Sequence, residues 1–194
     1  MYTNNNFDKK RFEAFIDAII AILLTILVLE IKLPAQADNE SLLNIIKSLF
    51  PLMVSFIATF VLMIGFWIDY HVLFLNIKYI TKQFILVNML FILSFSLLPF
   101  ITGFAIHNSS NPNCVALLSL CYFITNLFFS FIYWYARSNN LANPEFWKQS
   151  KKNAWLSIIV LLLLLGCIPL SYYSVPLTYT VFISGFSAHL LKKS

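Results

Sequence analysis

The stretch RFEAFIDAIIAILLTILVLEIKLP, residues 11–34, contains an apolar run long enough to cross a lipid bilayer. Two acids, Glu13 and Asp17, lie near its start, and Thr25 is the only polar side chain over residues 18–29. A membrane-spanning helix needs about 20 mainly apolar residues, and ionisable groups inside such a helix are costly. The two acids are therefore candidate functional residues, and the rest of the chain can be interpreted around this first span.

The composition indicates an integral membrane protein. The chain has 194 residues, of which 60% are hydrophobic and 11% are charged, and its mean hydropathy is +0.80. A soluble domain carries about 25% charged residues, so this chain has too little polar surface to cover a soluble globule. Its net charge of +5 falls in short clusters without interleaved aromatic residues. We therefore expect a lipid bilayer around the chain and no nucleic-acid partner.

Further apolar runs predict an all-α fold, a single transmembrane domain over residues 1–194 built as a six-helix bundle. The expected spans are 12–33, 50–75, 84–106, 114–136, 154–174 and 176–191. Pro99 and Pro169 lie inside the third and fifth spans and should kink them, because proline cannot donate a helical hydrogen bond. The two longest connections, 34–49 and 137–153, could each hold a short interfacial helix.

The distribution of lysine and arginine predicts the orientation of the chain in the membrane. If the N-terminus is cytoplasmic, only Lys32 and Lys47 face the outside. The other eleven of the 13 cationic residues face the cytoplasm: Lys9, Lys10, Arg11, Lys78, Lys82, Arg137, Lys148, Lys151, Lys152, Lys192 and Lys193. Cytoplasmic loops carry such an excess of Lys and Arg. We expect a multi-pass protein with both termini in the cytoplasm.

Signatures of enzymes and of metal or cofactor sites are missing from the sequence. Four glycines in the whole chain leave no Gly-rich phosphate loop, and neither HExxH nor a nucleophile elbow occurs. The three histidines are scattered, and the three cysteines form no CxxC pair. We therefore expect no enzyme activity, no metal and no cofactor. The filter sequence TVGYG of the usual potassium channels is also absent.

Helical periodicity gives the first span one apolar face with a single hydroxyl. At 100° per residue this face holds Phe15, Ala18, Ile22, Thr25, Ile26, Leu29 and Leu33. Glu13 and Asp17 lie about 140–180° away from Ile22 on the same helical wheel. The face could contact lipid or a neighbouring helix while the acids are buried in the bundle. Alternatively, it could line a narrow pore, in which rings of Ile22 and Leu29 would act as a hydrophobic constriction. Spacing alone does not choose between these interpretations.

A second group of polar and aromatic residues lies at the end of the second span. Trp67 and His71 are four residues apart and share a helix face, whereas Asp69 lies off that face. This segment should lie at the same depth as the charged residues that open the first span, Arg11, Glu13 and Asp17. Unpaired charges are expensive at this depth, so we expect a polar network that joins the two spans. One histidine with separate carboxylates is a weak metal site.

Two motifs resemble those of the transmembrane protein 175 family. The first is Arg11-x-x-x-Phe15-x-Asp17, followed by Ala21-Ile22, Thr25, Leu29-Glu30-Ile31 and Pro34, and the second is Trp67-x-x-x-His71-x-x-Phe74. The resemblance implies a bacterial potassium-permeable channel in the plasma membrane. Prokaryotic members of the family are homotetramers whose first helices surround the pore, so a homotetramer that passes potassium ions is implied for this chain.

The resemblance also assigns roles to residues. It makes Ile22 the first constriction, Ile26 and Leu29 further apolar layers, and Thr25 a hydroxyl layer implicated in selectivity. The residues that would hold the pore helix in place are Arg11, Phe15, Asp17, Trp67 and His71. The family pattern has serine where this chain has Ile16, which removes a hydroxyl from that network.

Two other functions remain open from the residues alone. A cation- or proton-coupled secondary transporter would use Asp17 or Asp69 as its coupling carboxylate, although the sequence shows no inverted repeat and little polar lining. A non-conducting membrane assembly subunit would carry no ion flux and would need a partner protein. A flux measurement separates all three functions.

Overall fold

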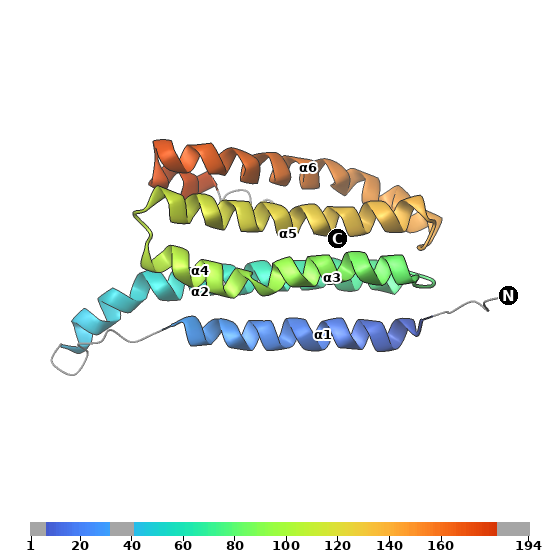
Figure 1. The fold of residues 1–194 in the computed structure, drawn as a ribbon, viewed down its shortest axis with the longest axis horizontal. Coiled ribbons are helices and arrows are strands. Elements are labelled where there is room, and N and C mark those ends of the chain that lie inside the picture. The colour runs from blue at the N-terminus through green and yellow to red at the C-terminus, as the bar shows by residue number, and fades with distance from the viewer. Residues whose placement is uncertain (1–6, 32–40, 182–194) are drawn as a thin grey trace.

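The computed structural model describes residues 7–31 and 41–181, and this part of the chain is helical without a β-strand (Figure 1). The elements are α1 (Lys9–Ile26), the 3-10 helix η1 (Leu27–Glu30), α2 (Leu42–Asn76), α3 (Lys82–Ser96), α4 (Leu98–His107), α5 (Pro112–Ser138) and α6 (Pro144–Tyr173). The expected all-α class is confirmed. The helices lie side by side along the long axis, with α1 on one flank of the bundle and α6 on the other. Between them, α5 packs against α3, α4 and α6.

The helix bounds differ from the expected spans mainly at two N-termini. Helix α2 begins at Leu42 and α6 begins at Pro144, so both long connections are largely taken up by helix extensions. No separate interfacial helix forms in the described part of either connection. Of the expected sixth span, residues 176–181 are helical and the remainder lies outside the described residues.

The two internal prolines have different effects. The expected third span is divided into α3 and α4 at Leu97, and Pro99 lies in the first turn of α4, where its missing N–H costs little. Helix α6, in contrast, continues through Pro169 to Tyr173.

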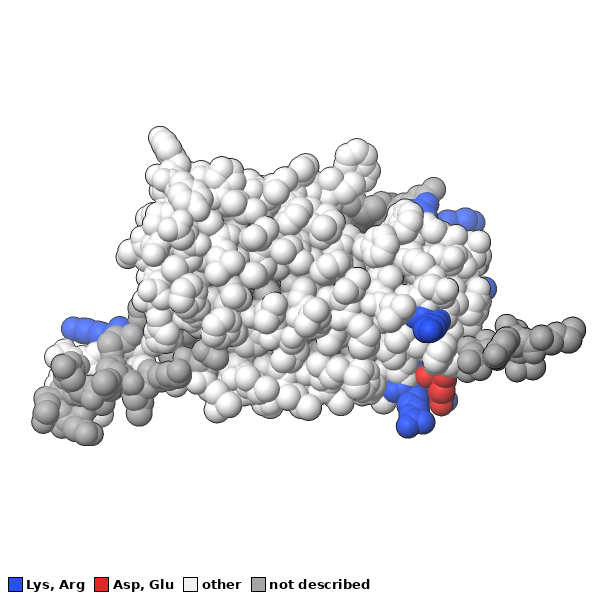
Figure 2. Space-filling model, viewed as in Figure 1, with Lys and Arg blue, Asp and Glu red and all other residues white. Residues whose placement is uncertain are grey.

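The described helices have the length and surface of a membrane protein. Four spans are long and apolar enough to cross a bilayer: Lys9–Leu29, Leu52–Asn76, Lys82–His107 and Pro112–Ser138. A shorter apolar helix covers Ser157–Tyr173. On the face shown in Figure 2, the charged side chains lie at the two ends of the molecule, and the long middle region carries none. This uncharged band fits a hydrocarbon core about 30 Å thick.

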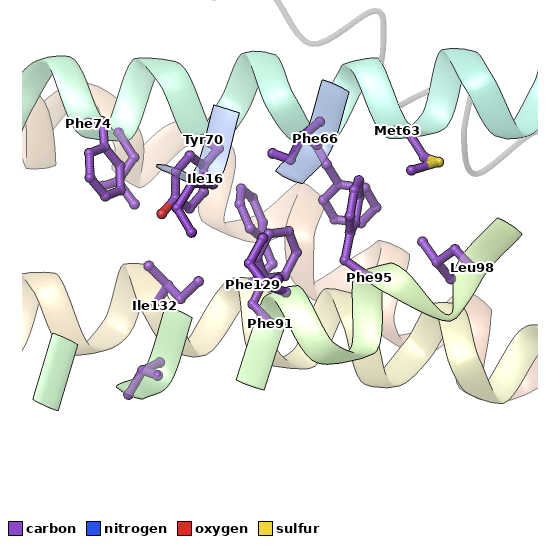
Figure 3. Packing of buried hydrophobic residues seen from close by; sticks show 14 of the residues in the cluster. Ile16, Met63, Phe66, Tyr70, Phe74, Phe91, Phe95, Leu98, Phe129 and Ile132 are labelled. Atoms are coloured by element: carbon purple, nitrogen blue, oxygen red, sulfur yellow. The ribbon is translucent and has the colours of Figure 1, made fainter. Parts of the chain in front are cut away.

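Aromatic side chains from α2, α3 and α5 fill the core (Figure 3). The ring of Phe66 lies 5.9 Å from Phe91, 5.7 Å from Phe95 and 5.3 Å from Phe129, measured between centroids. Because lipid tails are as apolar as these rings, close packing rather than escape from water holds such helices together. The core therefore fixes α2 as a rigid support for α1.

Candidate functional site

One face of α1 packs into the core. Phe12, Ile16, Ile20, Leu23 and Leu27 follow one another at intervals of three or four residues, and none is more than 9% exposed. Such spacing places all five on one side of a helix, where they meet α2 and the core behind it. This face fixes the rotation of the helix about its own axis.

The expected pore-lining residues all lie on the other face of α1 and of η1, to which Leu29 belongs. Exposure is 56% for Ile22, 40% for Ile26 and 68% for Leu29, and Thr25 is exposed beside them. The structure thus groups the four residues on one surface of the chain that its own core leaves uncovered. The fold leaves this surface available to lipid, to a second copy of the chain or to an ion pathway.

The hydroxyl of Thr25 has a defined orientation. Its Oγ1 donates a hydrogen bond to the carbonyl oxygen of Ile22, at 2.7 Å. This bond uses the only hydroxyl proton, so the remaining lone pairs of the oxygen can accept. Thr25 therefore offers an oxygen ligand in the middle of an apolar surface, which is the chemistry that a partly dehydrated cation requires.

Asp17, Trp67 and His71 form the expected link between the first two spans. Trp67 Nε1 donates a hydrogen bond to Asp17 Oδ1 at 2.9 Å, and the Trp67 and His71 rings stack at 5.6 Å. His71 Nδ1 lies 3.8 Å from Glu13 Oε1, an ion pair when the imidazole is protonated. The two acids of α1 are thus each matched to one side chain of α2. Glu13 also belongs to this network, although the residues assigned from the family resemblance did not include it. The signal in the sequence was an acidic side chain within an apolar helix, where an unpaired charge is costly.

Arg11 and Phe15 do not join these contacts within the described chain. The backbone N–H of Arg11 donates to Asp8, the N-cap of α1, and its side chain is exposed without an ion pair among the described residues. Phe15 is 50% exposed on the same face as Ile22. Ile16, which replaces the family serine, is fully buried in the core.

Asp69, the other candidate coupling residue, takes part in a different contact. Its carbonyl oxygen accepts a hydrogen bond from the Tyr133 hydroxyl at 2.8 Å, which ties α2 to α5. No group of three or more metal-binding side chains occurs within the described ranges.

The start of α1 also makes contacts that no sequence motif predicted. Short antiparallel bridges join Phe7 to Ile80 and Ile77 to Ala142. Lys9 Nζ also donates to the carbonyl oxygen of Ile77 at 2.7 Å, where a cation suits the C-terminal end of α2. The loop between α2 and α3 therefore holds both the beginning of α1 and the connection from α5 to α6. We call residues 77–81 the bridging loop.

Comparison with known proteins identifies relatives over the first half of the chain. Residues 11–99 match the family model described as endosomal/lysosomal potassium channel TMEM175. A protein of Chryseobacterium sp. (strain P1-3) named as a potassium channel is 32% identical over 106 residues, which are 54% of this chain and 53% of the relative. One of Chamaesiphon minutus, also named as a potassium channel, is 32% identical over 95 residues, 48% of this chain and 47% of the relative. The chain spans about half the length of these curated relatives.

Two solved structures share the fold over nearly the whole chain. The crystal structure of a lysosomal potassium-selective channel TMEM175 homolog from Chamaesiphon minutus has a TM-score of 0.83 at 23% identity, covering 96% of this chain and 99% of that one. A variant of the potassium channel MtTMEM175, solved with a Nanobody-MBP fusion protein, has a TM-score of 0.67 at 18% identity, covering 98% and 96%.

The family match includes both motifs, α1 from Arg11 onward and the Trp67–His71 segment, and Asp17 and Trp67 within it form a contact between α1 and α2. The apolar spans make the chain a multi-pass membrane protein. Together with the two bacterial relatives, these findings show that about half of the chain is similar in sequence to the TMEM175 family, and the solved structures show that the fold is shared over nearly the whole chain.

Proposed function

We propose that the chain is a subunit of a potassium-permeable cation channel. Four copies would surround a central axis, and each would contribute the exposed face of α1. The observation that carries this proposal is the grouping of Ile22, Thr25, Ile26 and Leu29 on the one face of α1 that the core does not cover. The names of the relatives, which are potassium channels, support the choice of ion.

In this arrangement potassium moves passively down its gradient. Four Ile22 side chains around the axis form a narrow apolar ring, and a cation that has lost its water cannot cross such a ring cheaply. Thr25, one turn away, supplies four hydroxyl oxygens that replace part of the hydration shell. Opening then requires the four α1 helices to move apart or to rotate.

The contacts of α1 with α2 support this assignment. The bond between Trp67 and Asp17 and the pair of His71 and Glu13 fix the depth and rotation of α1 near its start. A carboxylate that accepts a hydrogen bond from an indole has a structural role, so Asp17 is a weaker candidate for a coupling residue. We place the protein in the bacterial plasma membrane with both termini cytoplasmic, without a cofactor other than the permeant ion.

Flux into liposomes tests the proposal directly. Purified protein should admit potassium passively and sodium less well, and Ile22→Asn should raise the basal potassium flux at least several-fold. Leu162→Asn is a matched control, because Leu162 is similarly exposed, at 62%, but lies on α6. An unchanged flux in Ile22→Asn would remove Ile22 as the constriction.

The same experiment separates the alternative functions. A coupled transporter would show saturable flux that depends on a second ion and disappears in Asp17→Asn. A non-conducting subunit would show no flux in either cation from a stable, correctly assembled protein.

A further inference from the structure

Three exposed cationic side chains gather beside the bridging loop. Lys78 lies in the loop, Lys82 is the first residue of α3, and Arg137 lies in the last turn of α5. They come from separate parts of the sequence, and the fold brings them to one end of the bundle. On the face shown in Figure 2, most of the Lys and Arg side chains lie at this end.

Backbone contacts hold the three residues close together. The N–H of Lys78 donates to the carbonyl oxygen of Leu141 at 2.8 Å, and the N–H of Leu141 donates to Ala136, the neighbour of Arg137, at 2.9 Å. The rings of Phe84 and Tyr135, each two residues from Lys82 and Arg137 respectively, are 6.4 Å apart. The backbones of the three residues therefore lie in one seam, where the bridging loop, α3 and α5 meet.

This cluster is not neutralised by the chain's own acids. Within the described residues, no ion pair is found for Lys78, Lys82 or Arg137. Five described acids lie at the same end, Asp8, Glu13, Asp17, Asp69 and Glu145, against seven described cations, Lys9, Lys10, Arg11, Lys78, Lys82, Arg137 and Lys148. A surplus of positive charge remains at the seam.

An apolar surface lies directly below the cations. On α3, Leu86, Leu90 and Leu93 continue the line that begins at Lys82, and they are 46–63% exposed. On α5, Trp134 precedes Arg137 by one turn, is 59% exposed and stacks on Phe131 at 5.2 Å. Exposed tryptophan marks the headgroup level of a membrane. Arg137 is then about 4.5 Å farther out, at the depth of lipid phosphates.

We propose that Lys78, Lys82 and Arg137 bind the headgroup of an anionic phospholipid, whose acyl chains lie along the exposed faces of α3 and α5. A headgroup phosphate complements the unneutralised cations, and the leucines and aromatic rings below them fit the chains. Each cation near an anionic headgroup contributes about a fivefold gain in binding. The positive-inside rule predicts cations at this end of the molecule, but it does not predict that three cations from separate segments lie in one seam above exposed apolar residues.

Native mass spectrometry of the full-length protein in micelles tests the site, with phosphatidylglycerol and phosphatidylcholine as probes. The wild type should retain phosphatidylglycerol at least tenfold more tightly than phosphatidylcholine. Arg137→Gln should lose about fivefold of this preference, Arg137→Lys should keep most of it, and the variant with glutamine at all three positions should lose it. All three side chains are exposed, so folding should be retained, and circular dichroism checks this.

Lys10→Gln is the matched control, because Lys10 is an exposed cation at the same end but lies on α1. If Lys10→Gln weakens the preference as much as Arg137→Gln, the attraction is general surface charge and the site is refuted. Competition by millimolar glycerol phosphate would also overturn the proposal, since it would identify a site for soluble phosphates. A further test needs no substitution. Brominated phosphatidylglycerol bound near tryptophan should quench the tryptophan fluorescence of the wild-type protein. The lipid measurements do not depend on ion conduction.

Discussion

The two faces of α1 have almost the same chemistry and opposite surroundings. The inner face, which consists of Phe12, Ile16, Ile20, Leu23 and Leu27, is at most 9% exposed. The outer face carries Ile22 and Ile26 beside Leu29, and these are 40–68% exposed. Hydrophobicity cannot distinguish the faces, because in a bilayer both sides of a helix are apolar. The difference comes from the shape of the partner surface on α2 and from the polar contacts at the start of the helix.

The largest difference in unfolding free energy is expected when the same truncation is made on each of the two faces. Ile16→Ala opens a cavity in a packed core and should cost about 2–4 kcal/mol of unfolding free energy, whereas Ile22→Ala should cost less than about 0.5 kcal/mol in the isolated chain. Equilibrium unfolding in mixed micelles, at a protein concentration where the chain is dissociated, measures both. Equal losses would mean that the two faces are packed alike and would contradict this description of α1.

Loss of the hydrogen bond between Asp17 and Trp67 should lower the unfolding free energy by a smaller amount, because this bond lies at the border between the two faces. A hydrogen bond to a charged group contributes about 1.5–3 kcal/mol. We expect Trp67→Phe and Asp17→Ala to be coupled by about 1–2 kcal/mol in a double-mutant cycle of unfolding free energy. Additive losses would show that the bond does not hold α1 in place.

The smallest change in unfolding free energy is expected for a buried polar pair in the core, Tyr70 on α2 and Asn88 on α3. The Tyr70 hydroxyl donates to Asn88 Oδ1 at 2.8 Å, and Asn88 Nδ2 donates to the carbonyl oxygen of Phe84 at 2.6 Å. Tyr70→Phe should cost about 1 kcal/mol. Tyr172→Phe, which removes an exposed bond to Asn113, is the control and should cost less. Thermal unfolding of both variants compares them, and a larger loss for Tyr172→Phe would be contrary to expectation.

Patterns within one helix were predictable from the sequence. Length and hydropathy predict a helical membrane protein, and the 100° periodicity of residues 15–29 predicts that Ile22, Thr25, Ile26 and Leu29 share a face. The cost of charge inside the membrane also predicts a partner for Asp17, and Trp67 is that partner. These inferences need only local geometry and solvation.

Contacts between distant segments were not predictable in the same way. Nothing in the pattern of residues 77–81 distinguishes a bridging loop from a simple turn, because its bonds to Phe7 and Ala142 depend on the final packing of the helices. Both extensions fall in connections that could each hold a short interfacial helix, and they were not predicted as parts of α2 and α6 because polar residues, among them Lys47 in one and Lys148 in the other, interrupt the apolar runs. Arg11 was expected in the polar network by family pattern, yet its side chain is exposed.

The change of winding at the end of α1 has a geometric consequence for the exposed face. In η1, which begins at Leu27, each residue turns about 120° and rises about 2.0 Å, compared with 100° and 1.5 Å in an α-helix. Three such residues complete one full turn, so Leu29 lies almost directly above Ile26 along the helix axis. Rewinding this short stretch as an α-helix would swing Leu29 sideways by about 60° and draw it in by about 1.5 Å, while Ile22 stayed where it is. Rewinding this single turn would thus be enough to move Leu29 out of line with Ile26.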